Sequence, residues 1–94
     1  MAYEIEWTDP AKENFSEIVG YLYDTWGEAS AEKFTAKLEA SLAILEQFPF
    51  AGKQHDHIPA VHELVISKHH SLFYIVHDRK VMLINILNSA RRRH

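Results

Sequence analysis

The fold is decided by residues 61–87, VHELVISKHHSLFYIVHDRKVMLINIL. Three runs in this stretch, 61–66, 72–76 and 81–87, are rich in β-branched and aromatic side chains and are typical of strands. The link Asp78-Arg79-Lys80 is short enough for a hairpin, although it lacks the glycine that would identify the turn type. We therefore predict that three consecutive strands form a meander.

A further strand and a helix are predicted upstream. Tyr3, Ile5 and Trp7 alternate with acidic residues, which is the period of a strand with one buried face. The segment Thr8-Asp9-Pro10 then offers a capping oxygen and a proline that the first helical turn tolerates. Because the apolar residues that follow recur every three or four positions, we expect a helix that ends near Trp26.

A second helix is expected to begin directly after Gly27 and to be closed by Pro49 and Gly52. So short a link makes the two helices an antiparallel hairpin. Residues 1–94 then form a single α+β domain of order β-α-α-β-β-β. In this fold the helical hairpin packs on one face of a mainly antiparallel four-stranded sheet, and the other face stays open.

The composition excludes several classes of protein. The chain has 94 residues, 47% of them hydrophobic, and no cysteine, which rules out disulfides, thiolate zinc sites and a cysteine nucleophile. A cytoplasmic protein is therefore expected. The sequence also lacks a secretory signal and an apolar run long enough to cross a membrane, so we expect no membrane association.

Charge is distributed unevenly between the two halves of the chain. Residues 1–50 hold three Lys against ten acidic residues, a net charge of −7, whereas residues 51–94 hold seven Lys or Arg against three acidic residues, a net charge of +4. All seven histidines lie in the second half. This asymmetry predicts an acidic partner or a nucleic acid bound at the open sheet face, unless the helices are simply a solvated acidic layer.

The cations and imidazoles of the second half are the candidate site. Guanidinium and ammonium groups bind phosphate or carboxylate, and a neutral imidazole beside them can move a proton, as cleavage of RNA by its own 2′-hydroxyl requires. The alternative for the three terminal arginines is a frayed, solvated end. No metal or cofactor is expected, because the glycines are isolated and no ligand pattern is complete. The group comprises Lys53, His62, Lys68, His69, His70, Arg91, Arg92 and Arg93.

Several short segments, taken in order, resemble the RelE/ParE superfamily of toxins from type II toxin-antitoxin systems. The resemblance covers nearly the whole chain and includes the same β-α-α-β-β-β fold. The segments are Tyr3-Glu4-Ile5-Glu6-Trp7-Thr8 with Ala11, Trp26-Gly27, residues 45–49, Gly52-Lys53, Glu63-Leu64, Tyr74, and Leu87 followed by Arg91.

The resemblance implies a growth-inhibiting protein, with a role such as plasmid stabilization, that a cognate antitoxin holds inactive. That antitoxin is expected to be a short acidic protein whose C-terminal segment wraps the toxin as helix or strand. The ParE-like branch targets DNA gyrase, and the RelE-like branch cleaves mRNA in the ribosome. Candidate catalytic residues are His62, His69, His70 and Arg91. Candidate target-binding or antitoxin-binding residues are Lys53, Lys68, Asn88, Arg91, Arg92 and Arg93.

Two departures from the family pattern leave the target open. His62 stands where relatives commonly carry arginine, and Asn88 stands where many carry histidine. Because an amide is neither an acid nor a base near neutral pH, endoribonuclease activity is undecided, whereas gyrase inhibition needs only a binding surface. The alternative function is a non-toxic, degenerate relative that acts as an interaction module for an acidic peptide. Whether the chain forms a homodimer is also left open.

Overall fold

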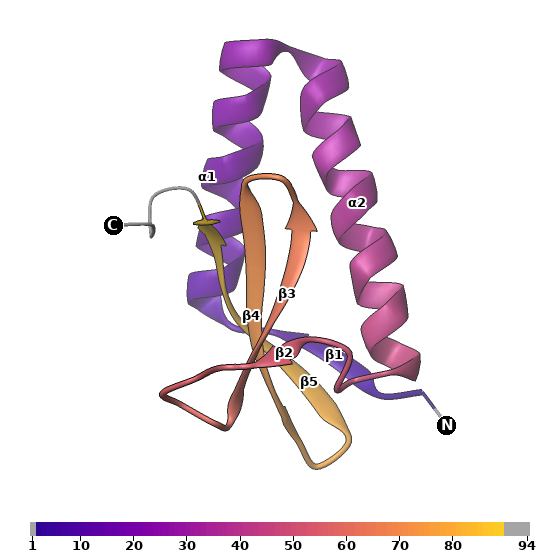
Figure 1. The fold of residues 1–94 in the computed structure, drawn as a ribbon. Helices are drawn as coiled ribbons and strands as arrows, with labels where there is room; N and C mark the ends of the chain where they lie inside the picture. Colours follow the sequence, from indigo (N-terminus) through magenta and orange to yellow (C-terminus); the bar gives the residue numbers. More distant parts are fainter. Residues whose placement is uncertain (1, 90–94) are drawn as a thin grey trace.

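The computed structural model of the chain describes residues 2–89 and contains two helices and five strands. Figure 1 shows the helices as an antiparallel pair beside the sheet. The elements, in chain order, are β1 Glu4–Trp7, α1 Asp9–Trp26, α2 Glu28–Gln47, β2 Lys53–Gln54, β3 Val61–Ser67, β4 His70–His77 and β5 Lys80–Asn88. The predicted helical hairpin is therefore confirmed, and so is the predicted order apart from one additional strand, β2.

The helix boundaries follow from local capping. The side chain of Thr8 accepts a hydrogen bond from the backbone N–H of Ala11, and Pro10 lies in the first turn of α1. Gly27 has a φ of 96° and donates its N–H to the carbonyls of Leu22 and Tyr23, which ends α1. Since α2 begins at the next residue, this one glycine turns the chain back and makes the hairpin.

The sheet has the strand order β1-β5-β4-β3-β2. β1 pairs with β5 in parallel, and every other pair is antiparallel. Asp78 and Arg79, both with positive φ, form the tight turn between β4 and β5 that the missing glycine had left undefined. The guanidinium of Arg79 lies 5.0 Å from the ring centre of Tyr3, which fastens this turn to the start of the chain.

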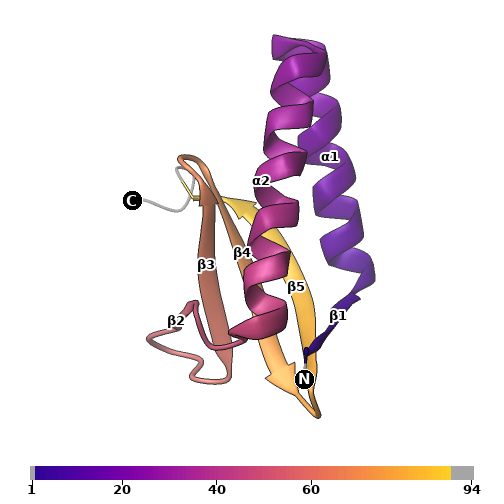
Figure 2. The ribbon, with the colours of Figure 1, turned by 90° about the vertical axis from the view of Figure 1, so that its right-hand side faces the viewer.

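The helices cover one sheet face only, as Figure 2 shows. Between the two layers lies a core of aliphatic and aromatic side chains, to which each helix contributes one stripe and each long strand contributes alternate residues. A bulge at Ile84 places Leu83 and Ile86 on the core side together, although they are three residues apart. The buried core consists of Ala11, Phe34, Leu38, Leu45, Ile66, Leu72, Tyr74, Val81, Leu83 and Ile86.

Two expectations need correction. The sheet has five strands rather than four, because Lys53–Gln54 adds a two-residue strand opposite His62 and Glu63. His62 and His70 were expected on the open face, but they point to the helix side. Alternation places His62 on the same side as Leu64 and His70 on the same side as Leu72. The His62 ring is stacked on Tyr74, and the His70 ring lies against Phe34 of α2.

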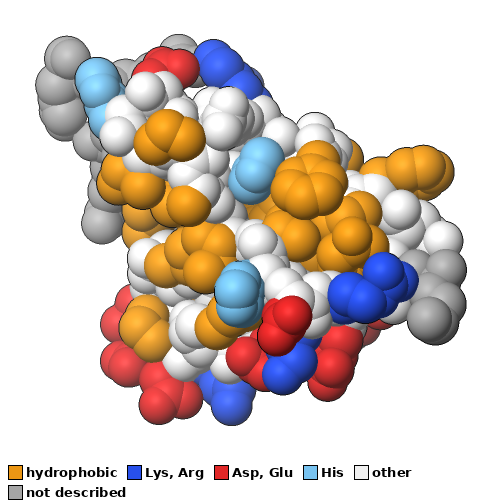
Figure 3. Space-filling view, turned by 90° about the horizontal axis from the view of Figure 1, so that it is seen from below, with side chains coloured by type: hydrophobic (Ala, Val, Ile, Leu, Met, Phe, Trp, Pro, Cys, Tyr) orange, Lys and Arg blue, Asp and Glu red, His pale blue; other side chains and the backbone are white. Residues whose placement is uncertain are grey.

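The described residues where β1 and β5 lie side by side carry charges of both signs. The register of β1 against β5 places Glu4 and Glu6 beside Lys80 and Met82, and Glu6 forms an ion pair of 3.7 Å with Lys80. At the lower end of the molecule, side chains of both charges lie next to one another and are interrupted by hydrophobic patches (Figure 3). At the β1–β5 pair and at the lower end of the molecule, the described residues therefore show mixed charge rather than the expected gathering of cations.

Candidate functional site: a groove between the first helix and the last strand

A groove of about 740 Å³ runs between α1 and the C-terminal half of β5. It exists because β1 is short. The pairing of β1 with β5 stops at Leu83, so within residues 2–89 no strand lies beside the rest of β5 on that side. The groove is lined by Asn14, Glu17, Ile18, Tyr21, Leu22 and Trp26 of α1 and, on the sheet side, by His69, His70, Ile86, Leu87 and Asn88.

Two polar side chains close part of the strand edge at the bottom of this groove. The hydroxyl of Thr8 donates to the carbonyl of Leu83 at 2.6 Å, where β1 ends. The side-chain oxygen of Asn14 accepts from the backbone N–H of Ile86 at 3.0 Å and from the side chain of Asn85 at 2.9 Å. α1 therefore takes the place of a neighbouring strand along this part of β5.

The walls of the groove expose large hydrophobic side chains. Trp26 is 70% exposed, Tyr21 is 63% exposed and Leu87 is 36% exposed. Ile18 and Leu22 lie between them and pack partly against the core. An aromatic and aliphatic surface of this kind, lining a concave site, is typical of a binding surface rather than of solvated protein.

One end of the groove is formed by the turn between β3 and β4. The backbone N–H of Ser89 donates to the carbonyl of His69 at 2.7 Å, which holds the end of β5 against this turn. The His70 ring lies 5.0 Å from the ring of Phe34, and its Nδ1 lies 3.3 Å from the hydroxyl of Ser67. Burial, together with repulsion from His69, lowers the pKa of His70, so this imidazole is neutral near pH 7.

A second group of predicted residues lies around Gly52, outside the groove. The His62 ring is stacked on Tyr74 at 5.5 Å and meets the Phe50 ring edge-on at 5.5 Å. Tyr74 accepts a hydrogen bond of 2.9 Å from the N–H of Gly52, while His62 Nδ1 lies 3.3 Å from the Gly52 carbonyl. Lys53 follows directly in β2 and is exposed.

The predicted site residues thus fall into two groups. His62 pairs with Tyr74, whereas His70 lies four residues earlier in β4, so roughly 13 Å of strand separates the two histidines. Lys68, His69, His70 and Asn88 belong to the groove end of the sheet, and Lys53 belongs with His62. The predicted arginines, Arg91, Arg92 and Arg93, lie outside the described residues.

The sequence-based reasoning missed the groove itself. Asn14 and Tyr21 were not singled out, and Trp26 served only to mark the end of the first helix and a segment of the family pattern, although most of its surface is exposed. One available signal was a tryptophan at the very end of an amphipathic helix, where the helix runs past the sheet.

Within residues 2–89 no three His, Asp or Glu side chains are placed to hold a metal ion. In that same part of the chain, neither helix combines the length and the apolar character that a bilayer span requires.

The sequence of residues 5–93 matches the family described as ParE toxin of type II toxin-antitoxin system, parDE. The chain belongs to the ParE toxin family. No curated protein matches it significantly. The predicted RelE/ParE relationship is therefore confirmed at the level of the family.

Solved structures share the ParE-family fold. A structure of the chromosomal ParDE system from P. aeruginosa superimposes with a TM-score of 0.78 at 19% identity, over 93% of this chain and 96% of that chain. The RelBE2 toxin-antitoxin complex from Mycobacterium tuberculosis superimposes with a TM-score of 0.68 at 14% identity, over 94% of this chain and 99% of that chain. A variant of E. coli RelE in the free state superimposes with a TM-score of 0.66 at 18% identity, over 97% of this chain and 87% of that chain.

Proposed function

We propose that this ParE-family chain inhibits growth by binding a macromolecular target, that the target is DNA gyrase, and that an antitoxin neutralises it by occupying the groove between α1 and β5. The observation that carries the proposal is the exposed apolar lining of that groove, Tyr21, Trp26 and Leu87, in a chain of only 94 residues. Several similar structures are themselves toxin-antitoxin complexes, among them DinJ-YafQ from E. coli and YoeB-YefM from Staphylococcus aureus.

Gyrase inhibition is favoured over RNA cleavage by the distance between one predicted acid-base group, His62, and the other two, His69 and His70. Cleavage by the RNA's own 2′-hydroxyl needs a base and an acid on opposite sides of one phosphate, within hydrogen-bond reach. His62 is held in an aromatic stack at one end of the sheet and His70 packs on Phe34 toward the other end. Target inhibition through a surface places no such demand on the imidazoles.

A growth experiment tests the first part of the proposal. The chain is expressed alone from an inducible promoter, beside an unrelated toxin that shows the host is sensitive. We expect growth arrest, with inhibition of supercoiling by purified gyrase and intact transcripts. If the unmodified chain cleaves transcripts and His70→Gln does not, the chain acts as an RNA-cleaving toxin and the gyrase proposal is wrong. Normal growth together with partner binding would favour the non-toxic interaction module.

A rescue experiment tests the groove. Genomic fragments that restore growth of the arrested strain identify a neutralising partner. Trp26→Ala removes an exposed ring from the groove, whereas Tyr23→Ala removes a ring that is 56% exposed and lies outside the groove lining. We expect the partner to bind Trp26→Ala at least tenfold more weakly, as is typical for a central tryptophan, and to bind Tyr23→Ala as it binds the unmodified chain. Equal binding to both variants would contradict the groove as the antitoxin site.

A further inference from the structure

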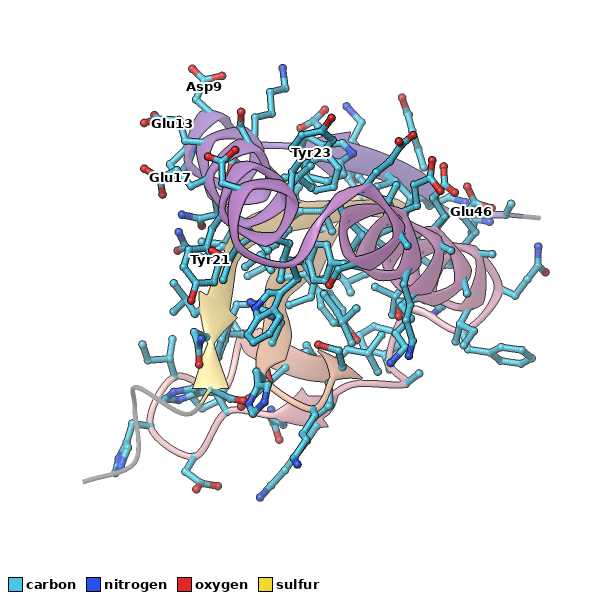
Figure 4. All side chains as sticks on the ribbon, turned by 90° about the horizontal axis from the view of Figure 1, so that it is seen from above. Asp9, Glu13, Glu17, Tyr21, Tyr23 and Glu46 are labelled. Carbon is cyan, nitrogen blue, oxygen red and sulfur yellow. The ribbon has the colours of Figure 1, made fainter. Side chains whose placement is uncertain are left out.

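A row of acidic side chains on α1 ends at the lip of the groove, where Glu17 lies. Asp9, Glu13 and Glu17 follow one another at intervals of four residues, about 6 Å apart along the helix axis. Figure 4 shows these three and Tyr21 projecting from the same side of α1, whereas Tyr23 and Glu46 point elsewhere. Glu17 and Tyr21 line the groove, so the row leads directly into it.

No described residue neutralises this row. Asp9 and Glu13 are exposed, and none of the three carboxylates forms an ion pair within residues 2–89. Three like charges at i, i+4 intervals repel one another slightly and contribute nothing to the stability of α1 beyond the favourable position of Asp9 in the first turn. Their arrangement therefore fits a cationic partner better than a role within the chain.

The opposite lip has different chemistry. His69 and His70 line the groove there, and Lys68 precedes them in the turn. One lip thus carries carboxylates, while the other offers imidazoles and an ammonium group. A segment that fills the groove therefore meets carboxylates on one flank and, on the other, imidazoles with the ammonium group of Lys68 next to them in the chain.

The strand edge indicates which conformation this segment has. The groups of β5 that an added strand would bond first, the carbonyl of Leu83 and the N–H of Ile86, are already bonded to Thr8 and Asn14. An entering strand would lose pairing along this part of the edge. An amphipathic helix needs no edge groups, because its own backbone is satisfied, and its apolar stripe fits the lining of Leu22, Trp26 and Leu87.

We infer that the groove selects a helical antitoxin segment that carries Lys or Arg at i, i+4 intervals along the flank facing α1. The inference rests on the proposed antitoxin site and specifies its partner. It also refines the expectation of a short acidic antitoxin, since acidic side chains of that segment belong on the flank facing Lys68 and His69. The charge row sets the orientation and specificity of binding, and the apolar lining supplies most of the affinity.

The test uses a displayed library of helical peptides of about 20 residues, long enough to span about 30 Å. Every peptide has the same leucine stripe, and each position flanking that stripe is either Lys or Glu. The full-length chain is the bait, and it is compared with Glu13→Gln/Glu17→Gln. The matched control is Glu32→Gln/Glu39→Gln, which removes two charges from α2 at a shallow depression between the helices, away from the groove.

We expect the unmodified chain and the control to enrich peptides with Lys along one flank only. Enriched peptides should bind Glu13→Gln/Glu17→Gln about three- to tenfold more weakly in 0.1 M salt, and the difference should shrink at 1 M salt, where the Debye length is about 3 Å. Enrichment without a Lys preference, or with Glu on both flanks, would overturn the inference while leaving the groove a binding site. If no peptide binds, or if Trp26→Ala binds them equally well, the groove itself is refuted as the docking site.

Discussion

The contact between Tyr74 and Gly52 gives the sharpest prediction about stability. Tyr74 is completely buried, and its hydroxyl accepts the N–H of Gly52 at 2.9 Å in a buried environment. In Tyr74→Phe the ring stays and the partner of this N–H is lost. A buried donor left without an acceptor costs about 1–3 kcal/mol. A loss of about 1.5 kcal/mol in the free energy of unfolding lowers the melting temperature of a domain of this size by roughly 6–12 °C.

The measurement is urea unfolding of Tyr74→Phe beside Tyr23→Phe, which makes the same chemical change at an exposed tyrosine. We expect Tyr23→Phe to stay within about 0.5 kcal/mol of the unmodified chain. Gly52→Ala provides a second approach, because a Cβ there would lie 2.6 Å from the Tyr74 hydroxyl and 2.9 Å from the Glu63 carbonyl. Equal stabilities of the two phenylalanine variants would refute the claim that this hydrogen bond fastens the loop before β2.

Three further predictions concern the groove and the titratable groups near it. Asn14→Ala should destabilise the chain by about 1–3 kcal/mol in urea unfolding, because the N–H of Ile86 loses its acceptor; unchanged stability would mean that water replaces the amide. Trp26→Ala should change stability by less than about 1 kcal/mol, since the ring is mostly exposed, although it weakens partner binding. Because the pKa of His70 is lowered in the folded chain, the unfolded chain takes up its proton first, so stability should fall as the pH drops below about 6.5. His70→Gln should flatten this part of the pH profile, and a profile identical to that of the unmodified chain would contradict the assignment.

The long elements could be predicted because they repeat a period many times. α1 and α2 each present several turns of one apolar stripe, and the strand runs at 61–66, 72–76 and 81–87 contain enough β-branched and aromatic residues to identify them. β2 could not be predicted, because two residues show no period. The bulge at Ile84 was also hidden, since a continuous apolar run looks the same with or without an extra residue.

The candidate site was harder to predict because it depends on lengths and on which side of the sheet is covered. Alternation with Leu64 and Leu72 already placed His62 and His70 on an apolar face, yet the count of positive charges suggested the opposite face. The groove arises from the difference in length between β1 and β5, and no local pattern encodes that difference. Asn14 gave no sign of its role, because its partner Ile86 is 72 positions away along the chain.

The pairing of β1 with β5 has a consequence for biosynthesis. Trp7 lies opposite Leu83, and Thr8 bonds to that same residue, so β1 can pair with its neighbour only after Leu83 has been synthesised. A nascent polypeptide cannot close the sheet any earlier, and a product terminated before Leu83 has no place for its first strand. The complete sheet therefore forms only after the residues of β5, Lys80–Asn88, have been synthesised.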